Sequence, residues 1–463
     1  MGDKLPDDVL AGAASSSSFP LPAGARAAGV LGVSLPLPLG AGGGEGQPRQ
    51  QHSDLPIADL RAQFPILAQS IHGHPLAYLD NAATTQTPLA VQQALLHFEQ
   101  HDRANIHRGV HSLSQRATDA FEAARAVLKR FTGAGKAHEL VFTSGTTEAL
   151  NIVAQGLWAA GPGKAWLRAG DRIIVSGLEH HANLVPWQQA ARMTGAELVI
   201  LQPDAQGRVH VQDLQALLTP ATRVFAITAG ANATGERPAY EQMLRMARAA
   251  GALTVLDAAQ AVGHEMPALA DLDCDFMAFS GHKMYGPMGT GALVGLRESL
   301  QLLYPLRLGG DMVDWVSYEA AGYAQLPARL EGGTPNVAGA VGLAAAAQFI
   351  DGVGRGAIDR HLHALRAQAL AGLLAIDGIS VLAPHATQAA LVSFVARDVH
   401  PHDIGTLLDE RGIAVRTGNH CAQPLHDHLG LGPTTRASFA LYNTSEEVDR
   451  FIAAVAHAIK VFQ

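Results

Sequence analysis

The chain has only two cysteines in 463 residues, Cys274 and Cys421, so it has no disulfide framework and is expected in a reducing compartment, the cytoplasm. No uninterrupted apolar run is long enough to span a bilayer. The net charge is −8 and no long block of Lys and Arg is present, which argues against a nucleic-acid partner. These absences predict a protein that binds neither membranes nor nucleic acid.

Charged residues are also sparse, at 16%, whereas hydrophobic residues make up 48% of the chain, ample for a large core. A length prior of roughly 150 residues per domain suggests two or three domains. The beginning of the chain differs from the rest, because it is rich in Ser, Pro and Gly, as in the serine run 15–18 and the glycines at 42–44. We expect residues 1–53 to form a disordered low-complexity extension rather than a targeting peptide.

Strand-like and helix-like segments alternate from Leu140 to Leu296, which is typical of a doubly wound, mostly parallel sheet. Ligands of such sheets bind at the carboxyl ends of the strands. Five polar residues lie at or just after predicted strand ends: Thr147, His180, Asn232, Asp257 and Lys283. The pattern predicts a large domain over 81–352, a smaller α+β domain over 353–463, and a segment, 54–80, that packs with the smaller domain.

The lysine candidate follows the apolar run Phe276–Phe279, in the sequence Ser280-Gly-His-Lys283. A lysine at the end of a rigid strand suits a Schiff base with an aldehyde cofactor, although an exposed lysine in a turn is the alternative. Thr146 and Thr147 begin a predicted helix after a short strand, where free N–H groups can bind an anion. Plain N-capping explains the same residues, and the two roles are compatible.

Three further positions carry chemistry in their side chains. His180 and His181 are adjacent and face apart, and no third ligand has suitable spacing, so stacking on an aromatic ring is favoured over a metal site. Cys421 lies beside His420 in a polar loop and is a candidate nucleophile, with an inert cysteine as the alternative. Arg436 has no acid nearby in sequence and suits a bidentate carboxylate anchor.

Five motifs stand out in the sequence: Glu179–Trp187, Asp257–Gln260, Ser280–Lys283, Gly332–Asn336 and Arg416–Cys421. Together they resemble the pyridoxal-phosphate-dependent cysteine desulfurases of the class V aminotransferase group, and most of all their Suf-type branch, which includes cysteine sulfinate desulfinases and selenocysteine lyases. The likeness covers roughly 54–463, although Ser144 and Gly332 stand where many relatives have Arg and Ala. It implies fold type I of this cofactor class, with a mostly parallel seven-stranded sheet flanked by helices and a smaller α+β C-terminal domain.

The resemblance also implies roles for single residues. Asp257 would keep the pyridine nitrogen of pyridoxal 5'-phosphate protonated. Thr334 would reach the phosphate of a neighbouring subunit, so a homodimer is implied. The implied cofactor-binding residues are Thr146, Thr147, His180, Asp257, Gln260, Ser280, His282, Lys283 and Thr334, and the substrate-binding candidates are Asn232, Arg436, His107 and Arg416.

The implied reaction converts L-cysteine to L-alanine, with Lys283, Cys421 and His180 as catalytic residues. Sulfur would remain on Cys421 as a persulfide and pass to an acceptor protein, for iron–sulfur cluster assembly. The short interval between Cys421 and Arg436 suggests a constrained loop, so the acceptor would approach the cysteine. Alternatives are cleavage of selenocysteine or cysteine sulfinate, an aminotransferase or kynureninase-like hydrolase that would not need Cys421, and a sulfur-carrier scaffold without turnover.

Overall fold

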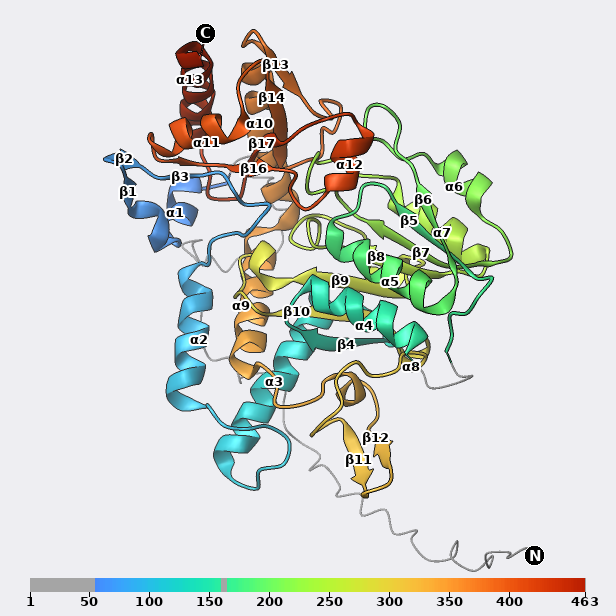
Figure 1. The fold of residues 1–463 in the computed structure, drawn as a ribbon. Helices are drawn as coiled ribbons and strands as arrows, with labels where there is room; N and C mark the ends of the chain where they lie inside the picture. The colour runs from blue at the N-terminus through green and yellow to red at the C-terminus, as the bar shows by residue number, and fades with distance from the viewer. Residues whose placement is uncertain (1–54, 160–164, 463) are drawn as a thin grey trace, which may run out of the picture. The chain divides into compact units, whose positions relative to one another are not determined.

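The central element of the structure, a computed structural model that describes residues 55–159 and 165–462, is a seven-stranded sheet (Figure 1). Strand β10 runs antiparallel to its neighbours β4 and β9, and the other strands are parallel. The prediction of a mostly parallel seven-stranded sheet is therefore confirmed. In sheet order the strands are β4 (His138–Thr143), β10 (Gly291–Leu296), β9 (Phe276–Ser280), β8 (Leu253–Asp257), β7 (Thr222–Thr228), β5 (Arg172–Ser176) and β6 (Glu197–Leu201).

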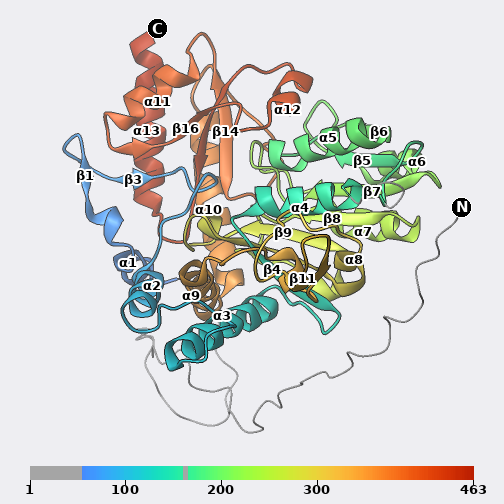
Figure 2. The same ribbon diagram turned by 60° about the horizontal axis from the view of Figure 1, so that its bottom comes forward.

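The strands are apolar on both faces because helices cover both. In β9, the four residues Phe276–Phe279 are completely buried, as expected for a strand between two helical layers. Helices α4 (Thr146–Trp158) and α5 (Val185–Thr194) share one core with the residues of one face, and α7 (Tyr240–Ala249) packs on β7 and β8. Figures 1 and 2 show α2 (Leu89–His101), α3 (Ser112–Phe131) and α9 (Val337–Val353) side by side, next to this sheet.

The C-terminal part of the chain forms an antiparallel four-stranded sheet with helices packed on it, as expected for an α+β unit. Its strands are β13 (Ile379–Val381), β14 (Leu391–Ala396), β17 (Thr434–Ser438) and β16 (Arg416–Gly418), and its helices are α10 (Arg355–Leu374), α11 (Pro401–Asp409) and α13 (Ser445–Phe462). The early strand β3 (Ala77–Tyr78) pairs in parallel with β15 (Ile413–Ala414). The exact domain boundaries stay a prediction, and the expected disorder of 1–53 lies outside the described residues.

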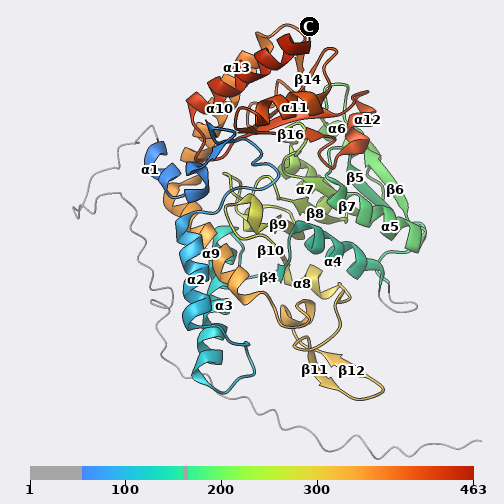
Figure 3. The same ribbon diagram turned by 60° about the vertical axis from the view of Figure 1, so that its left-hand side comes forward.

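Short elements complete the fold, among them the antiparallel hairpin β11–β12, which extends away from the sheet in Figure 3. Among the described residues no single helix is both long and apolar enough to cross a membrane, whereas α9 and α10, bent by 78° at their junction, pass that test as a pair by length and composition alone. The short elements are α1 (Ile57–Ala62), β1 (Ser70–Ile71), β2 (His74–Pro75), α6 (Val211–Leu217), α8 (Arg297–Gln301), β11 (Val313–Val316), β12 (Ala321–Tyr323), α12 (Gln423–His428) and five 3-10 turns, η1 (Pro65–Ala68), η2 (His181–Asn183), η3 (Leu269–Asp271), η4 (Gly281–Lys283) and η5 (Ala328–Leu330).

Candidate active site

A cavity of about 300 Å³ lies where strands of the large sheet end and the C-terminal part of the chain approaches them. Its lining combines residues from β8 and β9, the start of α4 and the loop after β16. All but two of the residues predicted for the site line this cavity: Thr146, Thr147, His180, Asn232, Asp257, Gln260, Ser280, His282, Lys283, Arg416, Cys421 and Arg436.

Lys283 and Asp257 form the charged centre of the cavity. Lys283 follows β9, and Asp257 ends the adjacent strand β8, so the parallel register brings both side chains to the same edge. Burial lowers the pKa of Lys283 below its usual value, and Asp257 only partly offsets that effect. Burial also raises the pKa of Asp257, whose Oδ1 accepts the N–H of Ala259 at 2.9 Å. The lysine amine is therefore easier to deprotonate than in water, as a nucleophile or base requires.

An anion cradle is built at the start of α4, a helix of 13 residues. Thr146 donates its N–H to Ser280 Oγ at 2.8 Å, and the two hydroxyl oxygens lie 2.7 Å apart. Gly145 precedes the helix with φ +151°, and a Cβ there would lie 3.0 Å from Ser280 Oγ. Glycine thus lets two hydroxyl groups and the free N–H groups of the helix converge on one point, which suits a phosphate group.

His180, one of three histidines that line the cavity, is held in place by its own turn. His180 follows β5 and its Nδ1 accepts the N–H of Ala182 at 3.0 Å. Burial and, to a lesser extent, the charge of Lys283 lower the pKa of His180 to about 4. The ring is therefore neutral at pH 7 and can stack on an aromatic group or exchange a proton.

Below this turn lies Glu179, a buried residue that the sequence analysis did not single out. Its carboxyl group accepts hydrogen bonds from the Ser176 hydroxyl, from Asn183 Nδ2 at 2.6 Å and from Thr228 N at 2.7 Å. Burial raises the pKa of Glu179 to about 8. The glutamate therefore ties the histidine turn to β5 and β7. An acidic residue at the end of an apolar strand was the sequence signal that could have revealed this role.

The thiol of Cys421 is exposed at the cavity, whereas Cys274 is buried and does not line the cavity. Cys421 and the preceding His420 both have left-handed backbone conformations, with φ +55° and +51°. Asn232 Nδ2 donates to the carbonyl oxygen of His420 at 2.6 Å. The nucleophile candidate thus sits on a backbone that is fixed from the large sheet.

Two arginines face the cavity and share one carboxylate. Arg416 makes a bidentate contact with Asp80 at 2.9 and 3.0 Å, and Arg436 Nη2 lies 3.4 Å from Asp80 Oδ1. Arg436 is only 2% exposed, and burial lowers its pKa to about 10. The sequence analysis found no acid near Arg436 because Asp80 is 356 positions away.

The chemistry of this donor set fits a phosphorylated aldehyde with a ring nitrogen. A buried lysine, a carboxylate, a neutral histidine and a hydroxyl-lined helix start converge in one cavity. Asn232 Oδ1 and Arg436 Nε are buried without a hydrogen-bond partner among the described residues. A substrate carboxylate can accept the Arg436 N–H, and a donor group of the same ligand can pair with Asn232 Oδ1. In residues 55–159 and 165–462, no group of three or more His, Cys, Asp or Glu side chains is arranged to hold a metal ion.

Two predicted residues, His107 and Thr334, lie outside this cavity. His107 has its Nε2 atom 3.2 Å from Glu122 Oε1. Thr334 lines a different cavity of about 240 Å³, together with the rest of the loop Glu331–Asn336. Their expected roles stay predictions.

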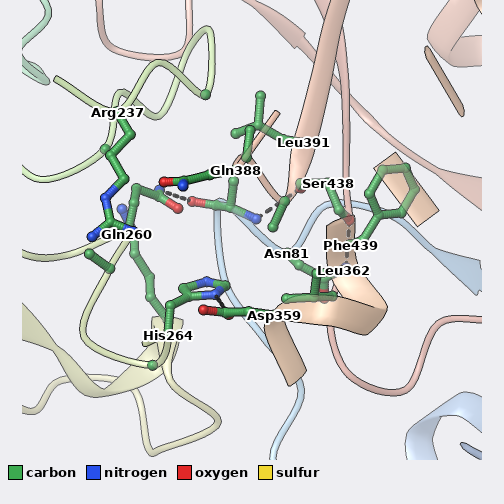
Figure 4. Close-up of a pocket in the computed structure, with 18 of the residues that line it drawn as sticks. Asn81, Arg237, Gln260, His264, Asp359, Leu362, Gln388, Leu391, Ser438 and Phe439 are labelled. Atoms are coloured by element: carbon green, nitrogen blue, oxygen red, sulfur yellow. Dashed lines mark hydrogen bonds and ion pairs between the residues drawn. The ribbon is translucent and has the colours of Figure 1, made fainter. Parts of the chain in front are cut away.

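A third cavity, of about 90 Å³, reaches the same lysine, because Lys283 and Gln260 line both this cavity and the larger one. Figure 4 shows Gln260 on one side of this space and Phe439 on the other, with His264 and Asp359 next to each other at the bottom of the view. His264 Nδ1 lies 2.7 Å from Asp359 Oδ1. Lys283 therefore lines two cavities at the junction of the large sheet and the C-terminal part.

Comparison with known proteins agrees with this geometry. Residues 77–451 match the family model described as Aminotransferase class-V. The chain is 44% identical over 400 residues to a probable cysteine desulfurase of Vibrio cholerae, covering 86% of this chain and 98% of that protein, and 41% identical to a cysteine desulfurase of Pectobacterium carotovorum over 86% and 97%.

Solved structures give the same result. The crystal structure of the cysteine desulfurase CsdA from Escherichia coli is similar with a TM-score of 0.80 at 39% identity, covering 88% of this chain and 99% of that one. The apo structure of cysteine desulfurase from Thermococcus onnurineus is similar with a TM-score of 0.82 at 36% identity, over 88% and 98%. The chain therefore belongs to the class V aminotransferase family of enzymes and is homologous to its cysteine desulfurases along most of its length.

Proposed function

We propose that this protein is a pyridoxal 5'-phosphate-dependent cysteine desulfurase that converts L-cysteine to L-alanine and passes the sulfur to an acceptor protein. The observation that carries the proposal is that Lys283, Asp257 and Cys421 line one cavity of about 300 Å³. An amine, an acid and an exposed thiol around one ligand-sized space are the groups that this reaction needs. The homology to cysteine desulfurases supports the same activity.

The cofactor would be held by residues at the ends of the sheet strands and at the start of helix α4. Thr146, Thr147, Ser280 and His282 would bind its phosphate, while Asp257 would bind the ring nitrogen, Gln260 the phenolic oxygen, His180 the ring face and Lys283 the aldehyde carbon. When bound, the cofactor supplies an electron sink for the negative charge that develops at the substrate Cα. Lys283 and Asp257 then have distinct tasks, since one exchanges a proton at Cα and the other keeps the ring nitrogen protonated.

The substrate would be oriented by its carboxylate. Arg436, together with Arg416 and Asn232, provides guanidinium and amide donors at one side of the cavity. Binding there places the substrate amino group toward Lys283. The substrate sulfur can then face Cys421, which lines the same cavity.

The sulfur step would belong to Cys421. The Cys421 thiolate attacks the sulfur of the substrate and forms an S–S bond with it. The C–S bond of the substrate breaks, and the electron pair of that bond stays with the substrate carbon. A proton delivered to the carbon that lost the sulfur completes L-alanine, and neutral His180 would serve as the proton carrier. The sulfur remains on Cys421 as a persulfide until an acceptor thiolate removes it.

The protein would act as a homodimer in the cytoplasm, with Thr334 reaching the cofactor phosphate of the partner subunit and His107 contributing to substrate binding. Both residues lie outside their own subunit's cavity, which is compatible with such a contribution. Iron–sulfur cluster assembly would be the destination of the sulfur.

Two variants test the proposal directly. The Cys421→Ser protein, given L-cysteine, should form no persulfide and release little alanine, whereas Cys274→Ser is the matched control because Cys274 is buried away from the cavity. The Lys283→Ala protein should lose the visible absorbance of the bound cofactor. Persulfide-forming turnover by Cys421→Ser at the normal rate would refute the role given to this residue.

Cleavage of L-selenocysteine is the second candidate, and the fixed backbone of Cys421 favours it, because a selenium atom can leave without a mobile thiol to collect it. The two activities separate in one experiment. Selenocysteine cleavage should survive in Cys421→Ser, whereas cysteine desulfuration should not.

A further inference from the structure

The nucleophile loop carries backbone strain that needs an external support. Consecutive left-handed conformations at His420 and Cys421, with φ +51° and +55°, are uncommon for residues with a Cβ atom. Neither residue is glycine or asparagine, the types that adopt this conformation most readily. Such a conformation persists only where the surrounding structure holds it.

Part of that support comes from His181, which has no role in the proposed reaction. His181 donates its backbone N–H to the carbonyl oxygen of Cys421 at 2.8 Å. Its ring atom Nε2 accepts the backbone N–H of Gln423 at 3.3 Å. His181 thus contacts the chain on both sides of Ala422, across a separation of more than two hundred positions.

The ring contact has a defined chemical requirement. Nε2 can accept a hydrogen bond only when it carries no proton, so the neutral ring must be protonated at Nδ1. His181 also directly follows His180, which lines the cavity beside Lys283. Two neighbouring residues of one turn therefore face two different parts of the site, the ligand space and the thiol loop.

We propose that His181 is a positioning residue that holds Sγ of Cys421 in its reacting location by bonding the backbone on both sides of Ala422. It does not line the cavity that would hold the cofactor and the substrate. The inference rests on the proposed role of Cys421, but the conformation of the loop can be measured independently of turnover.

The test uses the full chain with its cofactor and three variants. His181→Ala removes the ring acceptor, and His181→Gln offers a side-chain oxygen that can accept the Gln423 N–H. His428→Ala is the matched control, because His428 also belongs to this region but bonds Pro203 O at 2.8 Å from the far end of α12.

The first measurement is the rate at which iodoacetamide alkylates the protein. The chain has two cysteines and Cys274 is buried, so the rate reports on Cys421, with Cys421→Ser giving the background. We expect His181→Ala to change this rate several-fold, His181→Gln to restore much of it, and His428→Ala to match the unmodified protein.

The second measurement is persulfide formation from L-cysteine. The rate of a reaction falls steeply when its nucleophile is displaced. The kcat of His181→Ala should therefore fall roughly tenfold to a hundredfold, with KM and the cofactor absorbance nearly unchanged. An unchanged alkylation rate in His181→Ala would overturn the proposal, and so would a loss of cofactor absorbance that His181→Gln does not restore. If the unmodified protein forms no persulfide at all, the proposed function fails, while the alkylation rates still decide whether His181 fixes the loop.

Discussion

Replacing Glu331 by Ala should destabilise the protein and loosen the loop that carries Thr334. Glu331 begins this loop and is paired with Arg125 of α3, and the two side chains are only 8% and 7% exposed. Its Oε1 accepts Arg125 Nη1 at 2.7 Å and Phe142 N at 2.6 Å, and Oε2 accepts Arg125 Nη2 at 3.0 Å. Burial alone would lower the pKa of Arg125, but the Glu331 carboxylate outweighs this effect and holds that pKa above its usual value.

The expected size of the effect follows from this geometry. Removing one partner of a buried ion pair costs 3–5 kcal/mol, and the low end applies here because Glu122 remains as a second acceptor for Arg125, giving about 3 kcal/mol. For a chain of this length, that loss corresponds to a fall in Tm of about 3 °C. The matched control is Glu99→Ala, which breaks an exposed i,i+4 pair with Arg103 and should cost about 0.5 kcal/mol or less.

Thermal unfolding of the two variants and the unmodified protein, each with bound cofactor, tests the reasoning. The Glu331→Ala protein should also retain less cofactor after dialysis, because the loop is proposed to reach the phosphate of the partner subunit. A Tm equal to that of Glu99→Ala would show that the buried pair contributes no more than an exposed one, and the reasoning would fail.

Three further predictions concern the site itself. Asp257→Asn should abolish turnover while the lysine still binds the cofactor, because the ring nitrogen loses its anionic partner; normal alanine release would contradict this assignment. Gly291→Ala should weaken cofactor retention, since the new methyl group would overlap the Phe279 carbonyl oxygen and lie 2.6 Å from Gly145 Cα, whereas Gly432→Ala, with open space around it, is the neutral control. Between about pH 7 and about pH 5 the Tm of the cofactor-free protein should fall, because three histidines, one buried and two half-buried, stay neutral in the folded state and bind protons once unfolded. Burial lowers their pKa values from 6.5 to about 4, about 4 and about 3, for His180, His282 and His420. A Tm that rises toward acid pH would contradict the last prediction.

The parts of the fold that were predictable are those encoded by local apolar runs. The apolar run Phe276–Phe279 predicted a strand that ends just before Lys283, and β9 covers Phe276–Ser280. The sequence did not predict the direction of β10, because an apolar run of six residues reads the same whichever way its neighbours pass. Helix α7 also went unnoticed, although its apolar positions are spaced for a single buried face.

The residue types of the site were predictable from motifs, but their partners were not. Motifs indicated Lys283, Asp257 and Cys421, and the structure places all three at one cavity. The pairing of Asp80 with Arg416 joins residues 336 positions apart, and neither flanking sequence carries any sign of it. Such contacts arise only when distant segments pack, so the supporting bonds of a site stay hidden from sequence analysis.

The pairing of β3 with β15 has a consequence for the order in which this protein is made. Residues 77–78 leave the ribosome early, but their partner strand, residues 413–414, is synthesised near the end. Until then the early segment has no β-partner in this ladder and Asp80 lacks both arginines. The large sheet can assemble during translation, whereas the cavity around Lys283 closes only when the last tenth or so of the polypeptide has emerged.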